Sequence, residues 1–145
     1  MLEKLYTHQV AVNAYLLKAE KFLLLKRTCF PFIWSPPGGR LRPEEDPLEG
    51  LLREINEETD LDTEVITPVN TWFGKWNDQM LLAIDYLVYY QKGELQLSRE
   101  HSDGLWISIE ELRSGRPVKL ETTAGFQLTD FEKAWQLHNY FKKEK

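Results

Sequence analysis

The sequence lacks the features that mark secreted, membrane-spanning and nucleic-acid-binding proteins. Its single cysteine, Cys29, cannot form a disulfide within the chain, which suits a reducing compartment and a cytoplasmic location. Acidic residues outnumber basic ones by 23 to 18, and the net charge of −5 argues against nonspecific binding to nucleic acid. There is neither a basic start followed by an apolar stretch nor an apolar run of membrane length, so we expect no signal peptide and no membrane span.

Repeats, low-complexity tracts and linkers are also missing, so we expect a single domain over residues 1–145. The length and the 42% hydrophobic content are enough for a real core. Apolar runs predict strands at residues 8–17, 22–25, 65–72, 80–90 and 105–107, and a helical turn at 109–113. The third and fourth of these strands are expected to pair antiparallel, joined through residues 74–78.

Two longer helices complete the prediction. Asp46, Pro47 and Glu49 are the N-cap, the first residue and the returning acid of a helix that starts at residue 47. Thr129 and Glu132 predict a capping box at the start of a C-terminal helix, of which one face carries Phe131, Ala134, Trp135, His138 and Phe141. Strands flanked by two main helices predict an α/β fold, an α/β/α sandwich around a mixed β-sheet.

The first helix separates apolar from acidic side chains. The apolar spacing predicts that a single stripe faces the core, and it consists of Leu48, Leu51, Leu52 and Ile55. Gly50 and the carboxylates gather on another side: Glu54, Glu57 and Glu58. Like charges three and four residues apart repel, and only Arg53 stands close enough to relieve Glu49 and Glu57. A bound cation would remove that repulsion, and oxygen ligands favour Mg²⁺ first and Mn²⁺ second.

The simpler interpretation is an ordinary solvated acidic helix face, because most charge runs are solvated. The residues just before the helix argue for a site instead. Residues 34–40 form a stiff Pro-Pro turn followed by Gly38 and Gly39, whose exposed backbone can approach a ligand or donate a carbonyl oxygen to a metal.

These residues together resemble a known family. Their order and spacing resemble the Nudix box, a 23-residue pattern of the MutT-like Nudix hydrolases. The matching residues are Gly39, Glu45, the Arg53-Glu54-Ile55 triplet, Glu57-Glu58 and Leu61. One departure is Asp60, where the family usually has glycine to end the helix in a left-handed conformation. Asp tolerates that conformation better than most residues. The resemblance implies the Nudix fold and hydrolysis of a nucleoside diphosphate linked to another group, by attack of water on phosphorus.

The resemblance also implies residue roles. Metal ions would be held by Glu54, Glu57, Glu58 and the Gly39 carbonyl, while Glu45 and Arg53 orient these ligands. Glu54 and Glu57 are candidate proton acceptors. Some family members take the base from a downstream loop, which here is residues 98–103. Glu100 is the first choice there, with Asp103 and His101 behind it, so the expected catalytic set is Glu54, Glu57, Glu100 and Arg53.

Other residues are candidates for substrate binding, each with a simpler alternative. Trp72, Phe73 and Trp76 can stack on a base or pack as ordinary hydrophobic residues. Arg27 can reach a phosphate or form a surface ion pair, and Asp85 can line a pocket or occupy a solvent-facing position. Cys29 is expected to be a small buried hydrophobic residue.

Three functions therefore stand. The first is a Mg²⁺-dependent pyrophosphohydrolase acting as a monomer or homodimer on a nucleotide or derivative. Its substrate is most simply a nucleoside triphosphate, with a dinucleoside polyphosphate, a nucleotide sugar or ADP-ribose as further candidates. The second is a noncatalytic nucleotide-binding sensor of the same fold, against which the intact glutamates argue. The third is a small acidic cation-binding interaction domain, which lacks a dense loop of alternating oxygen ligands.

Overall fold

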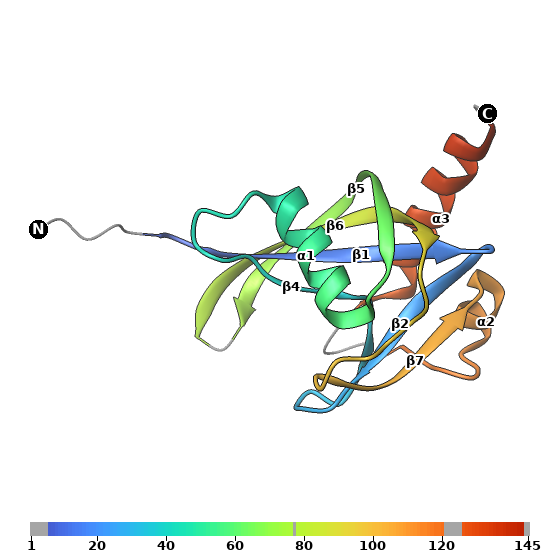
Figure 1. Ribbon diagram of the computed structural model, residues 1–145, viewed down its shortest axis with the longest axis horizontal. Helices are drawn as coiled ribbons and strands as arrows, with labels where there is room; N and C mark the ends of the chain where they lie inside the picture. The colour runs from blue at the N-terminus through green and yellow to red at the C-terminus, as the bar shows by residue number, and fades with distance from the viewer. Residues whose placement is uncertain (1–5, 77, 121–125, 144–145) are drawn as a thin grey trace, which may run out of the picture.

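The computed structural model describes residues 6–76, 78–120 and 126–143. Within these residues, seven strands form one sheet (Figure 1). The strands are β1 (Gln9–Lys18), β2 (Lys21–Arg27), β3 (Trp34–Ser35), β4 (Gly38–Arg40), β5 (Asp62–Trp76), β6 (Gln79–Lys92) and β7 (His101–Ile107). The helices are α1 (Pro47–Thr59), α2 (Ile109–Ser114) and α3 (Leu128–Lys143).

The sheet is mixed, as the sequence predicts. Strands run in the order β3-β2-β1-β6-β5, with β4 paired to β1 and β7 paired to β2. The β1–β6 pair is parallel, and every other pair of the described strands is antiparallel. One edge of β1 is divided, because β4 pairs with its first half and β2 only with its end. The short β4 strand therefore lies beside the centre of the sheet.

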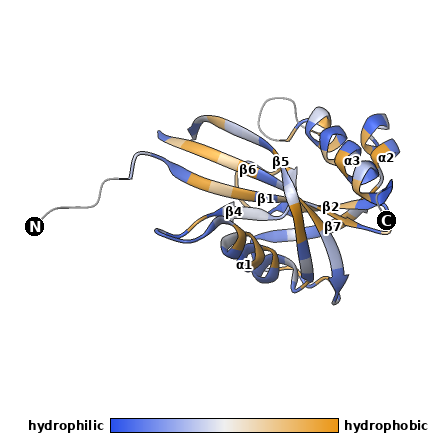
Figure 2. Ribbon diagram, turned by 90° about the horizontal axis from the view of Figure 1, so that it is seen from above, coloured by the Kyte–Doolittle hydropathy of each residue, from blue (hydrophilic) through white to orange (hydrophobic). Residues whose placement is uncertain are grey.

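The helices cover both faces of the sheet, α1 on one side and α2 with α3 on the other (Figure 2). Alternation along β1 explains both cores. Val12, Ala14 and Leu16 pack with Leu51 and Ile55 of α1. Tyr15 and Leu17 belong instead to the core on the α3 side, around Phe131. The predicted α/β/α sandwich is confirmed, while the extent of the domain over residues 1–145 stays a prediction.

Helix α1 begins as predicted but turns a different stripe to the core. Asp46 caps it, accepting from the N–H groups of Leu48 at 3.0 Å and Glu49 at 3.2 Å. Leu48 and Leu52 were expected in the core, yet they are 47% and 43% exposed. Glu58 is only 4% exposed, because it shares the i, i+4, i+7 stripe of Leu51 and Ile55. The expectation that all three glutamates lie away from the buried stripe is wrong for Glu58.

The helix ends bear on two further predictions. Asp60 has φ 61° and ψ 21°, so it occupies the left-handed conformation expected at the end of α1. The predicted Thr129–Glu132 capping box is wrong, since α3 already begins at Leu128. Asp130 stabilises this end instead, because its Oδ2 accepts from the N–H of Gln127 at 2.9 Å.

The β5–β6 hairpin is longer than predicted. Trp76 pairs with Gln79, so residues 74–76 belong to the strand and not to the connection. Of the expected connection, residue 77 lies outside the described residues. Two bulges interrupt β5, at Ile66 and Val69, and both side chains pack against the core on the α3 side. No helix among the described residues is both long and apolar enough to cross a membrane.

Candidate active site

Helix α1 meets strand β4 through two glycines. The N–H of Gly38 donates to Glu58 Oε1 at 2.8 Å. A Cβ added at Gly39 would lie only 2.6 Å from Cδ of Glu54. A side chain there would displace the Glu54 carboxylate, because real Cβ atoms essentially never approach another heavy atom within 3.0 Å. The glycines thus let the backbone of β4 lie directly against two carboxylates of α1.

Arg53 holds the more exposed carboxylates. Its Nε and one terminal nitrogen each contact a carboxylate oxygen of Glu45 at 2.8 Å, a bidentate pair. Its other terminal nitrogen donates to Glu54 at 3.1 Å and Glu57 at 3.2 Å. The hydrogen bonds from Arg53 lower the pKa of Glu45 to about 2. Among the described contacts, Arg53 reaches Glu54 and Glu57, and not Glu49 as expected.

Glu58 is buried, whereas Glu57 is exposed. Burial raises the pKa of Glu58 to about 8, although the Gly38 N–H opposes that shift. Burial is also the main cause of a raised pKa at Glu54. Glu57 stays exposed and pairs with Arg53 and Arg42. Two carboxylates are therefore desolvated together, an arrangement that a cation between them would stabilise.

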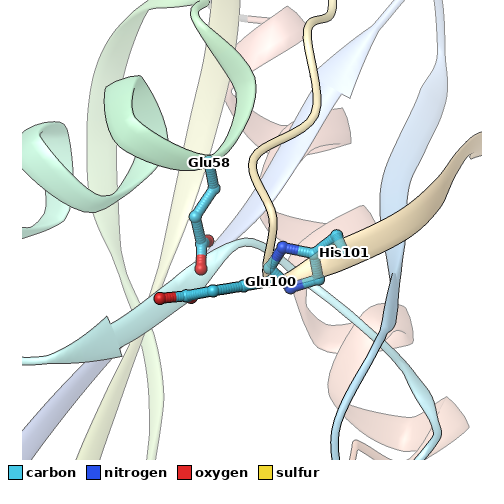
Figure 3. A group of neighbouring side chains, drawn as sticks. All are labelled: Glu58, Glu100 and His101. Carbon is cyan, nitrogen blue, oxygen red and sulfur yellow. The ribbon is translucent and has the colours of Figure 1, made fainter.

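A second element brings a carboxylate and an imidazole to Glu58. Ligand atoms of Glu58, Glu100 and His101 all lie within 4.8 Å of one another (Figure 3). Glu100 is exposed just before β7, whereas His101, the first residue of β7, is 7% exposed. Burial lowers the pKa of His101. Asp103 lies two residues further along β7, where its side chain accepts from the N–H of Gly104. The expected loop thus becomes a strand after Glu100.

A cleft of about 840 Å³ begins beside these residues and extends over the sheet on the α3 side. Arg27, Gly38, Gly39 and His101 line the end near α1, and Trp72 and Trp76 line the wall on β5. Asp85 lies on the floor and is 3% exposed. Glu54, Glu57, Glu58 and Glu100 do not line this cleft, but their neighbours Gly38, Gly39 and His101 do, together with most of the expected substrate-binding residues.

Two expectations about individual side chains are not met. Phe73 does not line the cleft; it points to the other face of β5, is 57% exposed and lies 5.4 Å from the His8 ring. Cys29 was expected to be buried but is exposed, with Sγ 3.4 Å from a terminal nitrogen of Arg27. Arg27 also donates from Nε to the carbonyl of Pro31 at 3.1 Å, which fixes its side chain at the cleft.

Several polar residues of the cleft were not singled out from the sequence. They are Asn13, Arg40, Asn70 and Asp130. Asn13 interrupts an apolar strand, a signal that could have been used. Asn70 and Asp130 carry no such signal, since their proximity depends on how β5 and α3 pack. Asn70 Nδ2 donates to Asp130 Oδ1 at 2.8 Å.

Fold and site together define a Nudix protein. The chain matches the family model of the NUDIX domain over residues 7–127. It therefore belongs to the Nudix family, and the resemblance seen in the sequence is confirmed.

Individual relatives are more distant. The chain is 30% identical over 97 residues to the mouse (Mus musculus) bis(5'-nucleosyl)-tetraphosphatase [asymmetrical], an alignment that covers 63% of this chain and 66% of that relative. The match thus spans slightly less than two thirds of that protein. Among solved structures, the MutT protein from Methanosarcina mazei Go1 is 26% identical with a TM-score of 0.75, covering 95% and 99% of the two chains. A C. elegans Ap4A hydrolase complex shares the fold at 20% identity and a TM-score of 0.72, covering 93% and 99%.

Proposed function

We propose that this protein is a divalent-cation-dependent pyrophosphohydrolase that cleaves a nucleoside diphosphate linked to another group. One observation carries the proposal: Glu54 and Glu58 lie against the glycine backbone of β4, which lines one end of a cleft of about 840 Å³, and Glu100 lies beside Glu58. Small-molecule sites typically have volumes of about 300–1,000 Å³. A nucleotide fits such a space with its phosphates at the carboxylate end.

The donor set fits Mg²⁺, with Mn²⁺ as the second choice. Carboxylate and carbonyl oxygens suit both ions, and the desolvated Glu58 needs a positive partner. In this proposal Glu54, Glu57, Glu58 and the Gly39 carbonyl hold the metal. A cation bound there supplies positive charge that offsets the negative charge developing on the phosphates.

Protein side chains supply the remaining functions. Arg53 and Glu45 hold the ligands in position through their bidentate pair. Glu54, Glu57 and Glu100 are the candidates for the proton acceptor of the attacking water, and Glu100 is exposed beside Glu58. Arg27 lies within electrostatic range of Glu58 and lines the cleft, so it can contact a phosphate.

Two substrate classes stand first. The small chain favours a nucleoside triphosphate, and the similarity to bis(5'-nucleosyl)-tetraphosphatases supports a dinucleoside polyphosphate. The noncatalytic sensor is less well supported, because every carboxylate of the pattern is present and two of them, Glu54 and Glu58, lie against β4. A cytoplasmic location agrees with a free, exposed Cys29. Monomer and homodimer remain the two assembly states to distinguish by sedimentation.

The test is a substrate panel. Purified protein is incubated with Mg²⁺ and nucleoside triphosphates, dinucleoside polyphosphates, nucleotide sugars or ADP-ribose, and products are identified by mass. We expect cleavage of one class at a phosphoanhydride and no cleavage in excess EDTA. Tight binding without turnover of any compound would support the sensor instead.

A further inference from the structure

Strand register builds a row of polar side chains across the cleft floor. Asn13 of β1 stands beside Asp85 of β6 in the parallel pair, and Asn70 of β5 stands beside Asp85 in the antiparallel pair. All three line the cleft. The row lies on the sheet and not on α1, so it is separate from the carboxylate cluster.

Asp85 is held in a fixed orientation. Its Oδ1 accepts from Asn13 Nδ2 at 2.9 Å, and its Oδ2 accepts from the Tyr15 hydroxyl at 3.0 Å. A carboxylate has about four acceptor positions, so these two bonds leave about two for a ligand. Asp85 lines the cleft, and no cation contacts its carboxylate among the described residues. The group is therefore preorganised to accept hydrogen bonds.

Charge is distributed unevenly along the cleft. Asp130 accepts a hydrogen bond from Asn70 and adds a second carboxylate near Asp85. Burial is the main cause of the raised pKa of Asp85, and the charge of Asp130 also raises it, while the hydrogen bonds to Asp85 oppose the shift. Arg27 and Arg40 line the cleft near β4 and the glycines, while Lys75 on the β5 wall pairs with Asp78 at 3.7 Å. Phosphates are consequently repelled from the floor and attracted to the α1 end. The uncharged end of a nucleotide is the part that can reach Asp85.

The next row of the floor makes a flat slot. Ala11 and Ala83 are partners in register, and Trp72 stands beside Ala83. Trp76 packs against the apolar group formed by Ala11, Leu81 and Ala83. The Trp72 ring lies over Gly74, where an added Cβ would come within 2.7 Å of the indole. Small side chains and flat rings leave room for a planar group whose edge meets Asp85.

We propose that Asp85, positioned by Asn13 and Tyr15, recognises the hydrogen-bond donor edge of the substrate base and selects guanine. Guanine presents two adjacent donors, N1–H and the N2 amino group, which match the two oxygens of one carboxylate. Hypoxanthine presents only N1–H, and adenine presents one amino donor beside a ring acceptor. Charge-assisted hydrogen bonds of this type are about twice as strong as neutral ones. This inference rests on the proposed function for its assumption that a nucleotide occupies the cleft.

The test measures binding of nucleoside monophosphates, which contain no anhydride to cleave. Dissociation constants of GMP, IMP and AMP are measured by calorimetry for the native protein and for Asp85→Asn. We expect GMP to bind about tenfold more tightly than IMP or AMP, the scale of a hydrogen bond to a charged group. Asp85→Asn should weaken GMP binding about tenfold and remove the preference. Asp62→Asn, at an exposed residue of β5, is the matched control and should change nothing.

Several results would overturn the proposal. Equal affinity for GMP and IMP in the native protein does so without any variant, and so does absence of measurable binding for all three. A guanine preference that survives in folded Asp85→Asn shows that Asp85 is structural. If GMP is preferred but no compound of the substrate panel is cleaved, the base recognition stands and the hydrolase proposal fails.

Discussion

The two ends of the cleft are built in different ways. At the α1 end, Glu54, Glu57 and Glu58 lie within five residues of sequence, and helical periodicity alone brings them together. At the floor, Asn13, Asp85 and Asn70 come from three strands and meet only through pairing. A local pattern thus fixes the first group, whereas the second depends on the register of the whole sheet.

Acids paired with arginine and acids without such a pair differ in how their charge is compensated, and the second kind occurs at both ends. Arg53 compensates Glu45, Glu54 and Glu57 directly. Among the described residues, the hydrogen bonds to Glu58 and Asp85 come from uncharged donors, and burial raises the pKa of both, to about 8 and about 6. Arg53 therefore fixes the orientation of the first three acids, whereas the positive partner of Glu58 and the ligand of Asp85 belong to the two proposals.

The largest expected effect is at the α1 end. Glu58→Gln should lower kcat by about 100-fold or more, the scale of a lost electrostatic or general-base contribution. Steady-state kinetics with varied Mg²⁺ checks this, with Glu49→Gln on the exposed side of α1 as the control. Undiminished turnover in Glu58→Gln, or in excess EDTA, would remove the distinction between the two ends.

The pH dependence of stability tests both buried acids. Because both groups bind protons more tightly folded than unfolded, the free energy of unfolding of metal-free protein should fall as the pH rises. The loss of stability due to Asp85 should occur between pH 3.8, its usual pKa, and about pH 6, its pKa in the folded protein. The loss due to Glu58 should occur between pH 4.5 and about pH 8. The total loss should be on the order of a few kcal/mol. Denaturant titrations at several pH values check this.

Variants and metal separate the two contributions. Asp85→Asn should flatten the lower part of the profile, and Glu58→Gln or added Mg²⁺ should flatten the upper part. Glu45 acts in the opposite sense, because its low pKa gives stability that is lost as the pH falls below 4.5 toward about 2. A profile that rises from pH 5 to 8 in metal-free protein would contradict the burial of both acids.

Arg53 offers a comparison within the α1 end. Its side chain is 18% exposed and serves three carboxylates, whereas the Arg42 side chain is 65% exposed and contacts Glu57 at 3.4 Å. Arg53→Ala should lower the free energy of unfolding by about 2 kcal/mol, and Arg42→Ala by less than about 0.5 kcal/mol. Equal effects in denaturant titrations would mean that Arg53 acts only as a surface charge.

The aromatic wall should affect binding more than turnover. Trp72→Ala and Trp76→Ala should raise KM about tenfold with kcat largely retained, since stacking on a base is worth about 1–3 kcal/mol. Phe73→Ala is the internal control, because Phe73 points away from the cleft. A fall in kcat without a change in KM would place these rings in the chemistry and not in binding.

The smallest effect lies outside both ends. Asp60 already adopts the left-handed conformation with φ 61°, so Asp60→Gly should be neutral or stabilising by up to about 1 kcal/mol. Thermal unfolding measures it. A clear drop in Tm would show that the Asp60 side chain has a stabilising partner.

Features that depend on local sequence spacing could be predicted, whereas features that depend on strand pairing could not. The cap at Asp46 and the sandwich depend on local spacing and alternation, and both are found. The burial of Glu58 follows from the stripe it shares with Leu51 and Ile55, whereas its contact with Gly38 was missed because it forms only when β4 pairs with β1. The role of Asp130 at the start of α3 was missed because it is also fixed by Asn70, sixty residues away.

Strand β5 shows why alternation can mislead. Outside the bulges, even-numbered residues turn to the α3 side: Glu64 stands beside Tyr89 of that core, and Asn70 and Trp72 line the cleft. Yet the phase is inverted between the bulges, where Thr67 pairs with Leu87 and Pro68 with Tyr86. Two one-residue shifts cancel, and the sequence period of two conceals them.

Those bulges also bear on how the cleft can change between related chains. Val65 pairs with Val88 and Asn70 pairs with Asp85, so five residue steps along β5 match three along β6. The two extra residues bend β5 just before the segment that contains Trp72 and Trp76. Deleting one codon, for Ile66 or Val69, removes a bulge while the flanking pairs keep their partners. The wall that holds Trp72 then leans differently over an unchanged floor. Insertions and deletions in this strand are therefore a route to new substrate widths that leaves every catalytic codon untouched.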